Sequence, residues 1–149
     1  MDLAYTLAEY IEKVGYKDIP AEVVEVTKKS ILDTLGVTVG GSTAPGVKEI
    51  IDLVKEGGGK EESTIIAYGG KVPAWMAAFA NGAMAHQLDY DDTADTGFVH
   101  PSPPTVCAGF AIAERIGKVS GKEFITAITL GNDMISRIGL ALAERPKGW

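Results

Sequence analysis

Residues 81–105 read Asn81-Gly-Ala-Met-Ala-His-Gln-Leu-Asp-Tyr-Asp-Asp-Thr-Ala-Asp-Thr-Gly-Phe-Val-His-Pro-Ser-Pro-Pro-Thr105. This stretch holds both histidines of the chain and four of its carboxylates, namely His86, His100, Asp89, Asp91, Asp92 and Asp95. It separates two apolar segments with helical periodicity. Charged groups at such a break are costly to desolvate, so they persist where solvent reaches them or where they carry out chemistry. A solvated acidic loop accounts for the carboxylates alone, whereas the flanking histidines favour a functional site.

Helical periodicity dominates the chain on both sides of this stretch. We therefore predict a mostly α fold, a multi-helix bundle with one small β-hairpin. Capping residues, prolines and glycines set the expected bounds. The expected elements are a first helix that Gly15 ends, a helix over 20–41 capped by Asp18, a helix over 45–57, a hairpin over 63–72, and helices over 73–88, 103–117 and 120–143.

The helix over 73–88 is expected at the centre of the bundle. It has no charged residue between Ala74 and Ala85, and small side chains recur along it. Small residues at this density let neighbouring helices approach closely.

The bulk composition limits the classes of function. A chain of 149 residues, 46% of them hydrophobic, suits one domain with a real core. A net charge of −6 argues against nucleic acid and anionic membranes as partners. The single cysteine, Cys107, is expected to be a core residue, and a cytoplasmic location is the default expectation. The N-terminus lacks the basic-then-apolar order of a signal peptide.

The cluster allows three chemical interpretations, the first of which is a metal site. Carboxylate and imidazole together suit Mg²⁺, Mn²⁺ or Zn²⁺. Residues 91–95 match the Asp-Asp-x-x-Asp pattern of helical isoprenoid synthases, which hold Mg²⁺-diphosphate. Those enzymes also need a second motif, in which Leu140 here occupies the position of the final glutamate. This interpretation therefore ranks third.

The second interpretation is acid–base catalysis without a metal, because a carboxylate beside a histidine can remove and return a proton. Asp89 ends an apolar helix and is expected to be the most buried carboxylate. Asp91, Asp92 and Asp95 are expected to be more solvated, with a helix or loop cap as an alternative role for Asp92. His86 precedes Asp89 by one helical turn, so the two are expected to share a face. The remaining interpretation is a catalytically silent helical module.

The residues of this stretch also resemble a known family. The segment over 80–93, followed by His100-Pro-Ser and an alanine-rich helix, resembles the MmgE/PrpD family, which includes 2-methylcitrate dehydratase, cis-aconitate decarboxylase and iminodisuccinate epimerase. The resemblance extends along the whole chain, through the Leu-Ala-Glu-Tyr-Ile opening, Ile31-Leu-Asp-Thr-Leu-Gly36, the hairpin over 63–71, and residues 131–142.

The resemblance implies a helical domain that packs beside an α+β lid domain in a homodimer. It implies a lyase or isomerase that acts on small di- or tricarboxylates by acid–base chemistry, with no metal and no organic cofactor. The family's active-site Asp, Thr and His map to Asp89, Thr93 and His100, the last by its Pro-Ser suffix. His86 and Ser102 are candidates for substrate contact, with structural hydrogen bonding as an equal alternative for His86.

The family pattern continues beyond the last residues of this sequence. Relatives carry substrate-binding lysines and a tyrosine after the Gly-Trp pair, and Arg145 and Lys147 do not replace them by position. We therefore expect residues 1–149 to be an MmgE/PrpD-type helical domain truncated at its C-terminus and inactive alone. The alternative is a silent module that binds a partner chain completing the site. Dehydration, decarboxylation and epimerisation share the mapped residues, so the sequence does not choose among them.

Overall fold

The computed structural model describes residues 2–95 and 97–142. These residues form six α-helices, one turn of 3₁₀ helix and one two-stranded antiparallel sheet. The elements, in chain order, are α1 (Leu3–Lys13), η1 (Tyr16–Asp18), α2 (Ala21–Gly41), α3 (Val47–Glu56), β1 (Ser63–Thr64), β2 (Lys71–Val72), α4 (Ala74–His86), α5 (Ser102–Ile116) and α6 (Gly121–Ala141). The mostly α-helical fold with one hairpin is confirmed.

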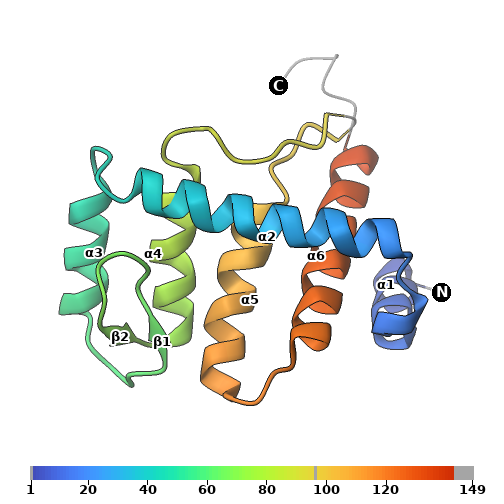
Figure 1. The fold of residues 1–149 in the computed structure, drawn as a ribbon, viewed down its shortest axis with the longest axis horizontal. Helices are drawn as coiled ribbons and strands as arrows, with labels where there is room; N and C mark the ends of the chain where they lie inside the picture. The colour runs from blue at the N-terminus through green and yellow to red at the C-terminus, as the bar shows by residue number, and fades with distance from the viewer. Residues whose placement is uncertain (1, 96, 143–149) are drawn as a thin grey trace.

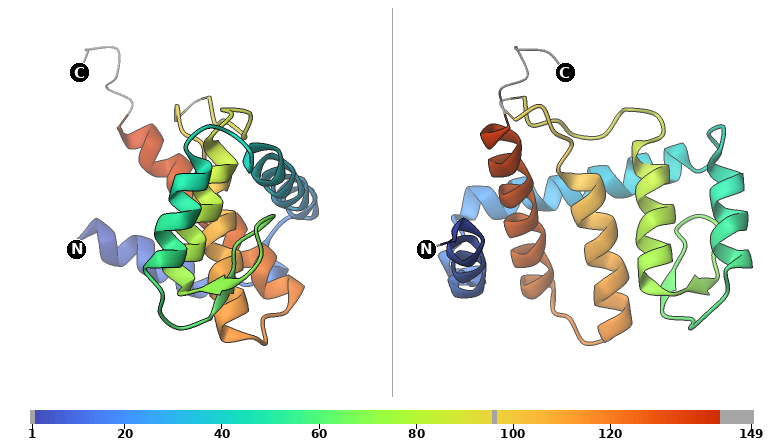
Figure 2. Two further views of the ribbon diagram at one scale, coloured as in Figure 1. Left: turned by 90° about the vertical axis from the view of Figure 1, so that its left-hand side faces the viewer. Right: turned by 180° about the vertical axis from the view of Figure 1, so that it is seen from behind.

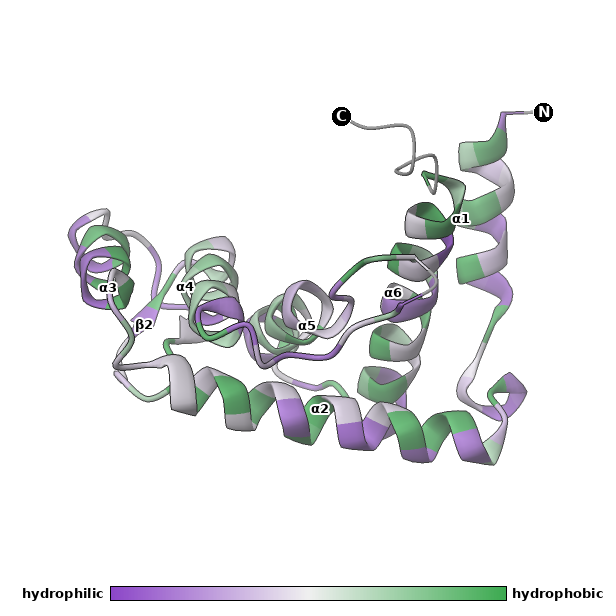
Figure 3. Ribbon diagram, turned by 90° about the horizontal axis from the view of Figure 1, so that it is seen from above, coloured by the Kyte–Doolittle hydropathy of each residue, from purple (hydrophilic) through white to green (hydrophobic). Residues whose placement is uncertain are grey.

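The helices form two layers. Helices α3, α4, α5 and α6 stand side by side in a row, and the long helix α2 lies across one face of that row (Figures 1 and 3). The hairpin lies at one end of the row, beside α3 and α4 and on the same face of the row as α2 (Figures 1 and 2). Helix α1 lies beyond α6 at the other end and buries no residue (Figure 2).

Helix α4 is central, as the sequence predicts. Its small side chains pack against α2, α3 and α5. Its approach to α2 is close, since a Cβ atom on Gly41 would collide with the backbone carbonyl of Met84. Only glycine permits two helix backbones to come this near, so Gly41 sets the distance between the layers.

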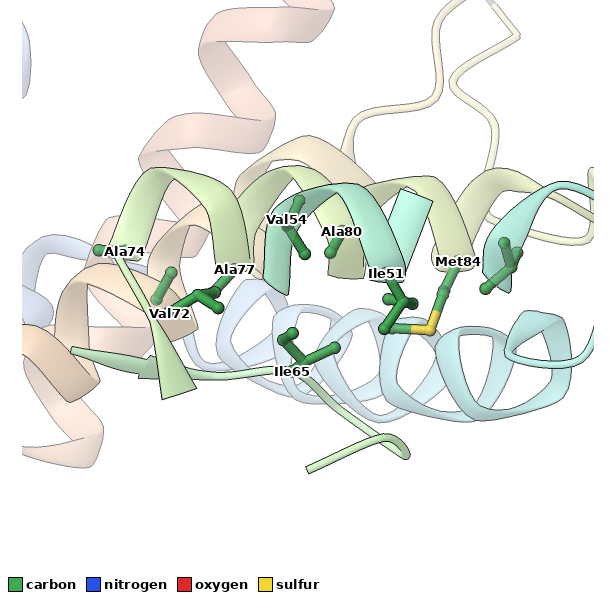
Figure 4. Packing of buried hydrophobic residues seen from close by; sticks show 10 residues of the cluster. Ile51, Val54, Ile65, Val72, Ala74, Ala77, Ala80 and Met84 are labelled. Carbon is green, nitrogen blue, oxygen red and sulfur yellow. The ribbon is translucent and has the colours of Figure 1, made fainter. Parts of the chain in front are cut away.

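The main hydrophobic core lies where α3, α4 and the hairpin meet (Figure 4). Its branched side chains come from α3 and the hairpin, while α4 contributes mostly alanines. The buried members are Val47, Ile51, Val54, Ile65, Val72, Ala74, Ala77, Ala80, Met84 and Ala111.

The hairpin is confirmed, but its strands are shorter than the sequence suggests. Ser63 pairs with Val72 and Thr64 with Lys71, and the intervening residues form a wide loop. The buried amide of Asn81 on α4 holds that loop: its oxygen accepts from the Ile66 N–H at 2.9 Å, and its nitrogen donates to the Thr64 carbonyl at 3.1 Å.

Most helix ends follow the predicted capping chemistry. Ser120 and Glu123 form the expected capping box of α6, and Gly117 ends α5 in a left-handed conformation with φ of 87°. The prediction for Asp18 is wrong. Its carboxylate accepts from the Gly15 N–H at 2.9 Å and closes the 3₁₀ turn, while Pro20 occupies the N-cap position of α2 without a side-chain hydrogen bond.

Two further expectations concern the ends of the chain and the membrane. The predicted end of the last helix at Ala143, together with Arg145, Lys147 and the Gly-Trp pair, lies outside the described residues. Within residues 2–95 and 97–142, no helix combines the length and apolarity needed to cross a bilayer.

Candidate active site

The predicted site lies on the loop that connects α4 to α5. This loop runs over one end of the helix row towards the last turns of α6 and returns to α5 (Figure 1). Near the tip of the loop, Ala94 and Val99 form an isolated antiparallel β-bridge, in which the Ala94 N–H donates to the Val99 carbonyl at 2.8 Å. The tip rests on α6, where Gly97 and Gly139 meet so closely that a Cβ on Gly139 would lie 2.7 Å from the Gly97 carbonyl oxygen.

A polar network fixes the returning arm of the loop. Asp92 accepts from the Ser102 N–H at 3.1 Å and from the Ser102 hydroxyl at 2.5 Å. Asn132 on α6 donates to the same hydroxyl at 3.0 Å, and its oxygen accepts from the Thr105 hydroxyl. Asp92 thus caps the first residue of α5, the alternative role named for it above. Ser102 is fully buried and its hydroxyl is engaged on both sides, which argues against direct contact with a substrate.

Asp91 is the buried carboxylate of the site, and both histidines face it. Its side chain is 1% exposed. Nδ1 of His86 lies 3.0 Å from each of the two Asp91 oxygens. Nδ1 of His100 is itself buried and lies 2.9 Å from Oδ2 of Asp91, although this contact lacks the alignment of a hydrogen bond. The two rings are in edge contact, with centroids 4.9 Å apart.

The expected order of burial among the carboxylates is therefore wrong. The Asp89 side chain is 78% exposed, and its Oδ1 lies 3.8 Å from Nε2 of His100. Asp89 has a φ of 55°, a left-handed conformation that is uncommon outside glycine but better tolerated by aspartate. This conformation turns the chain at the end of α4, so that Asp89 faces solvent while Asp91 turns inward.

Thr93 lies at the rim of the site. Its hydroxyl donates to Asp95 at 3.0 Å. Thr93, Asp95 and His100 line one hollow of about 370 Å³, together with Phe98 and Val99.

His100 separates this hollow from a second, more apolar one. The second hollow has a volume of about 510 Å³ and extends along α4 from the two imidazoles. Its lining residues are Ala78, Phe79, Gly82, Ala83, His86, His100, Pro103 and Pro104. Neither hollow has a lysine or arginine among its described lining residues, so neither offers a permanent cation to a carboxylate.

The geometry tests the two metal hypotheses separately. Ligand atoms of His86, Asp89, Asp91 and His100 lie within 4.8 Å of one another, close enough to share one divalent ion. The structure does not support the Asp-Asp-x-x-Asp hypothesis, because the three aspartates of that motif contact different partners. Asp91 faces the imidazoles, Asp92 caps α5, and Asp95 accepts from Thr93. The segment is also a loop and not a helix, so the three carboxylates do not converge on one Mg²⁺.

Cys107 is a core residue, as expected. It is buried in α5, and this burial raises the pKa of its thiol to about 11, against the opposing effect of a hydrogen bond with Thr38. A thiol held protonated in this way is not a nucleophile.

Comparison with known proteins places the chain in a family. The model of the MmgE/PrpD N-terminal domain matches residues 5–149, which include every candidate residue of the site. The chain belongs to the MmgE/PrpD family. Cis-aconitate decarboxylase of Homo sapiens is 31% identical over 130 residues, covering 85% of this chain and 26% of that protein.

Two fungal members of the MmgE/PrpD family are also similar. Cis-aconitate decarboxylase-like protein oryM of Aspergillus oryzae is 25% identical over 142 residues, covering 91% of this chain and 30% of that protein. Cis-aconitate decarboxylase of Aspergillus terreus is 25% identical over 140 residues, covering 91% of this chain and 29% of that protein. The chain thus spans less than a third of the length of these relatives.

Sequence reasoning missed part of the candidate site. It located His86, Asp89, Thr93 and His100 in one loop region, and the structure brings the two histidines and Asp89 together. It did not identify Asp91 as the shared partner of both rings, or the support that Thr105 and Asn132 give to Ser102. Asp91 lies five positions after His86 and nine positions before His100. Neither spacing belongs to a helix or a strand, so no periodicity in the sequence could have indicated that Asp91 contacts both rings.

Proposed function

We propose that this chain forms the acid–base part of a lyase that acts on a small polycarboxylate, with cis-aconitate as the first substrate to test. The family and the names of its relatives support the substrate class. The observation that carries the proposal is the pairing of His100 with Asp89 at the mouth of the site, 3.8 Å apart, in front of the buried Asp91. An imidazole with an exposed carboxylate on one side and a buried one on the other is suited to proton transfer.

The proposed chemistry requires a positioned proton donor. When a carboxylate leaves carbon as CO₂, the electron pair of the broken bond stays on the substrate until a proton reaches carbon. We assign that proton transfer to Nε2 of His100, with Asp89 as the neighbouring group that exchanges the proton with solvent. Thr93 lies on the rim of the same hollow and is assigned to substrate orientation.

Substrate recognition needs groups beyond this site. A di- or tricarboxylate requires cations or oriented donors, and the negative charge that develops in the reaction requires them more. The described lining of both hollows contains neither lysine nor arginine. We propose that these cations come from a further domain or a partner subunit, as the greater length of the relatives suggests.

The test is a product assay on the complete protein encoded by the gene. Cis-aconitate, 2-methylcitrate and iminodisuccinate are supplied in turn, and products are followed by proton NMR. His100→Ala and Asp89→Asn should each lower kcat by about 10²–10⁴-fold, the usual contribution of a positioned acid or base. Glu61→Gln, an exposed carboxylate outside the loop, is the matched control and should retain activity.

The same assay separates this proposal from its alternative. Turnover of one substrate identifies the reaction class. A folded, complete protein that turns over none of the three would favour the catalytically silent module. Full activity in His100→Ala would overturn the assignment of the proton transfer.

A further inference from the structure

Two imidazole rings share one buried carboxylate in this site. Among the described residues, His86 and His100 face Asp91, and in both cases the facing atom is Nδ1. A carboxylate buried to 1% exposure needs hydrogen-bond donors, because its desolvation is otherwise too costly. Nδ1 of His86, at 3.0 Å from both oxygens, is aligned to supply one donor, and Nδ1 of His100 lies 2.9 Å from Oδ2 without that alignment.

This arrangement determines where each ring carries its hydrogen. An ionised carboxylate only accepts hydrogen bonds, and a neutral imidazole has a single N–H group. We infer that Asp91 is a positioning residue that holds both His86 and His100 in the tautomer with hydrogen on Nδ1. Nε2 of each neutral ring is then the proton acceptor, and a ring that has taken up a proton on Nε2 can return it from the same atom. The catalytic consequence rests on the proposed function: His86 becomes a second acid–base group beside His100.

The two acceptors have different surroundings. Nε2 of His100 faces the exposed carboxylate of Asp89 at 3.8 Å. The His86 side chain is 56% exposed and lines the apolar hollow along α4. A substrate bound against the rings would thus contact Nε2 of His100, which faces Asp89, and Nε2 of His86, which faces the apolar hollow. The pair can accept a proton at one position and return it at another.

Asp91 holds the two rings unequally. His86 aligns with both carboxylate oxygens, whereas the buried Nδ1 of His100 lacks an aligned hydrogen bond. His100 therefore needs a small turn of its ring to donate to Asp91. Replacing Asp91 by asparagine would reveal how far each ring depends on this carboxylate, because asparagine has one acceptor oxygen and one donor nitrogen. A ring whose Nδ1 accepts from the amide nitrogen would carry its own hydrogen on Nε2.

Long-range proton–nitrogen NMR on the ¹⁵N-histidine-labelled chain tests the inference directly. The chain has only 2 histidines, so each ring gives a resolved pattern. In mildly alkaline buffer, the wild-type protein should show both rings with hydrogen on Nδ1. A histidine free of such a partner in water favours hydrogen on Nε2, so this result would be distinctive. Rings with hydrogen on Nε2 in the wild-type protein would overturn the inference without any variant.

Asp91→Asn and Asp95→Asn form the matched pair. Asp91→Asn should shift one ring to the Nε2 tautomer, and Asp95→Asn, on the exposed side of the loop, should shift neither. A folded Asp91→Asn protein with both rings unchanged would refute the role of Asp91.

A kinetic measurement separates the inference from the proposed function. In the complete protein, Asp91→Asn should lower kcat by about 10²–10⁴-fold with a smaller effect on KM, as expected when a ring takes the wrong tautomer. If the wild-type rings carry hydrogen on Nδ1 but Asp91→Asn leaves kcat unchanged, the catalytic role of Asp91 and His86 is overturned. Loss of the proposed function itself would appear as absent turnover in the wild-type protein, with the tautomer measurement unaffected.

Discussion

The Ser102 hydroxyl donates to Asp92 at 2.5 Å, and this bond joins the start of α5 to a loop residue ten positions earlier. The Ser102 N–H donates to the other oxygen of the same carboxylate at 3.1 Å. Because His100 lies two residues before Ser102, this closure determines where the imidazole meets Asp91. The cap and the site are thus one structural unit.

Asp92→Ala should destabilise the fold by about 1–2 kcal/mol, the usual cost of removing a helix cap and leaving a buried donor unpaired. Urea unfolding followed by circular dichroism measures the change. Asp95→Ala, an exposed carboxylate on the same loop, is the control and should change the free energy of unfolding by less than about 0.5 kcal/mol. Equal stability of the Asp92→Ala and wild-type proteins would show that the closure contributes nothing.

Gly41→Ala should destabilise the fold by about 1–3 kcal/mol, because the added methyl group would meet the Met84 carbonyl and separate the two layers. Gly40→Ala, one residue earlier in α2, has open space around the new Cβ. That control should be neutral or stabilising by up to about 1 kcal/mol, since alanine favours helix. Thermal unfolding of the two variants gives the comparison. A Gly41→Ala protein as stable as the Gly40→Ala protein would contradict the close packing of α2 on α4.

Glu114→Gln should reduce stability near neutral pH more than in acid. Burial alone would raise the pKa of Glu114, but hydrogen bonds from Lys71 and Thr64 outweigh it and lower the pKa below its ordinary 4.5. A lowered pKa in the folded state stabilises the protein above pH 4.5, and this contribution disappears as the pH falls through the lowered value.

The expected loss in Glu114→Gln at neutral pH is about 1 kcal/mol, because the carboxylate is partly exposed to solvent. Unfolding measured across the acid range should show a shallower pH dependence than in the wild-type protein. Glu61→Gln, at an exposed neighbouring position, is the control. An unchanged pH dependence in Glu114→Gln would rule out this link between the hairpin and α5.

Calorimetric titration with pyrophosphate in the presence of Mg²⁺ should give only weak heats without saturation. The three aspartates of the Asp-Asp-x-x-Asp pattern face different partners and cannot bind one ion together. Saturable pyrophosphate binding that depends on Mg²⁺ would instead support the isoprenoid-type site.

Local chemistry could be predicted from the sequence wherever neighbouring residues suffice. The capping box of Ser120 and Glu123 and the end of α5 at Gly117 both depend on contacts within a few residues, and both are confirmed. Asp18 shows the limit of this reasoning. An aspartate two residues before Pro20 is suited to cap α2, but the Asp18 carboxylate instead accepts a hydrogen bond from the Gly15 N–H.

Residue patterns alone predict the helical fold, the central position of α4 and the family motif that contains His86, Asp89, Thr93 and His100. Which carboxylate is buried follows only from the folded chain. That choice depends on the left-handed turn at Asp89 and on the packing of the loop tip against α6. Burial of a side chain depends on all the groups around it. Asp91 is covered by His86 and His100, which lie at opposite ends of a long loop. A contact between residues that share no helical or strand period leaves no regular pattern in the sequence, so the exchange of roles between Asp89 and Asp91 became visible only once the chain was folded.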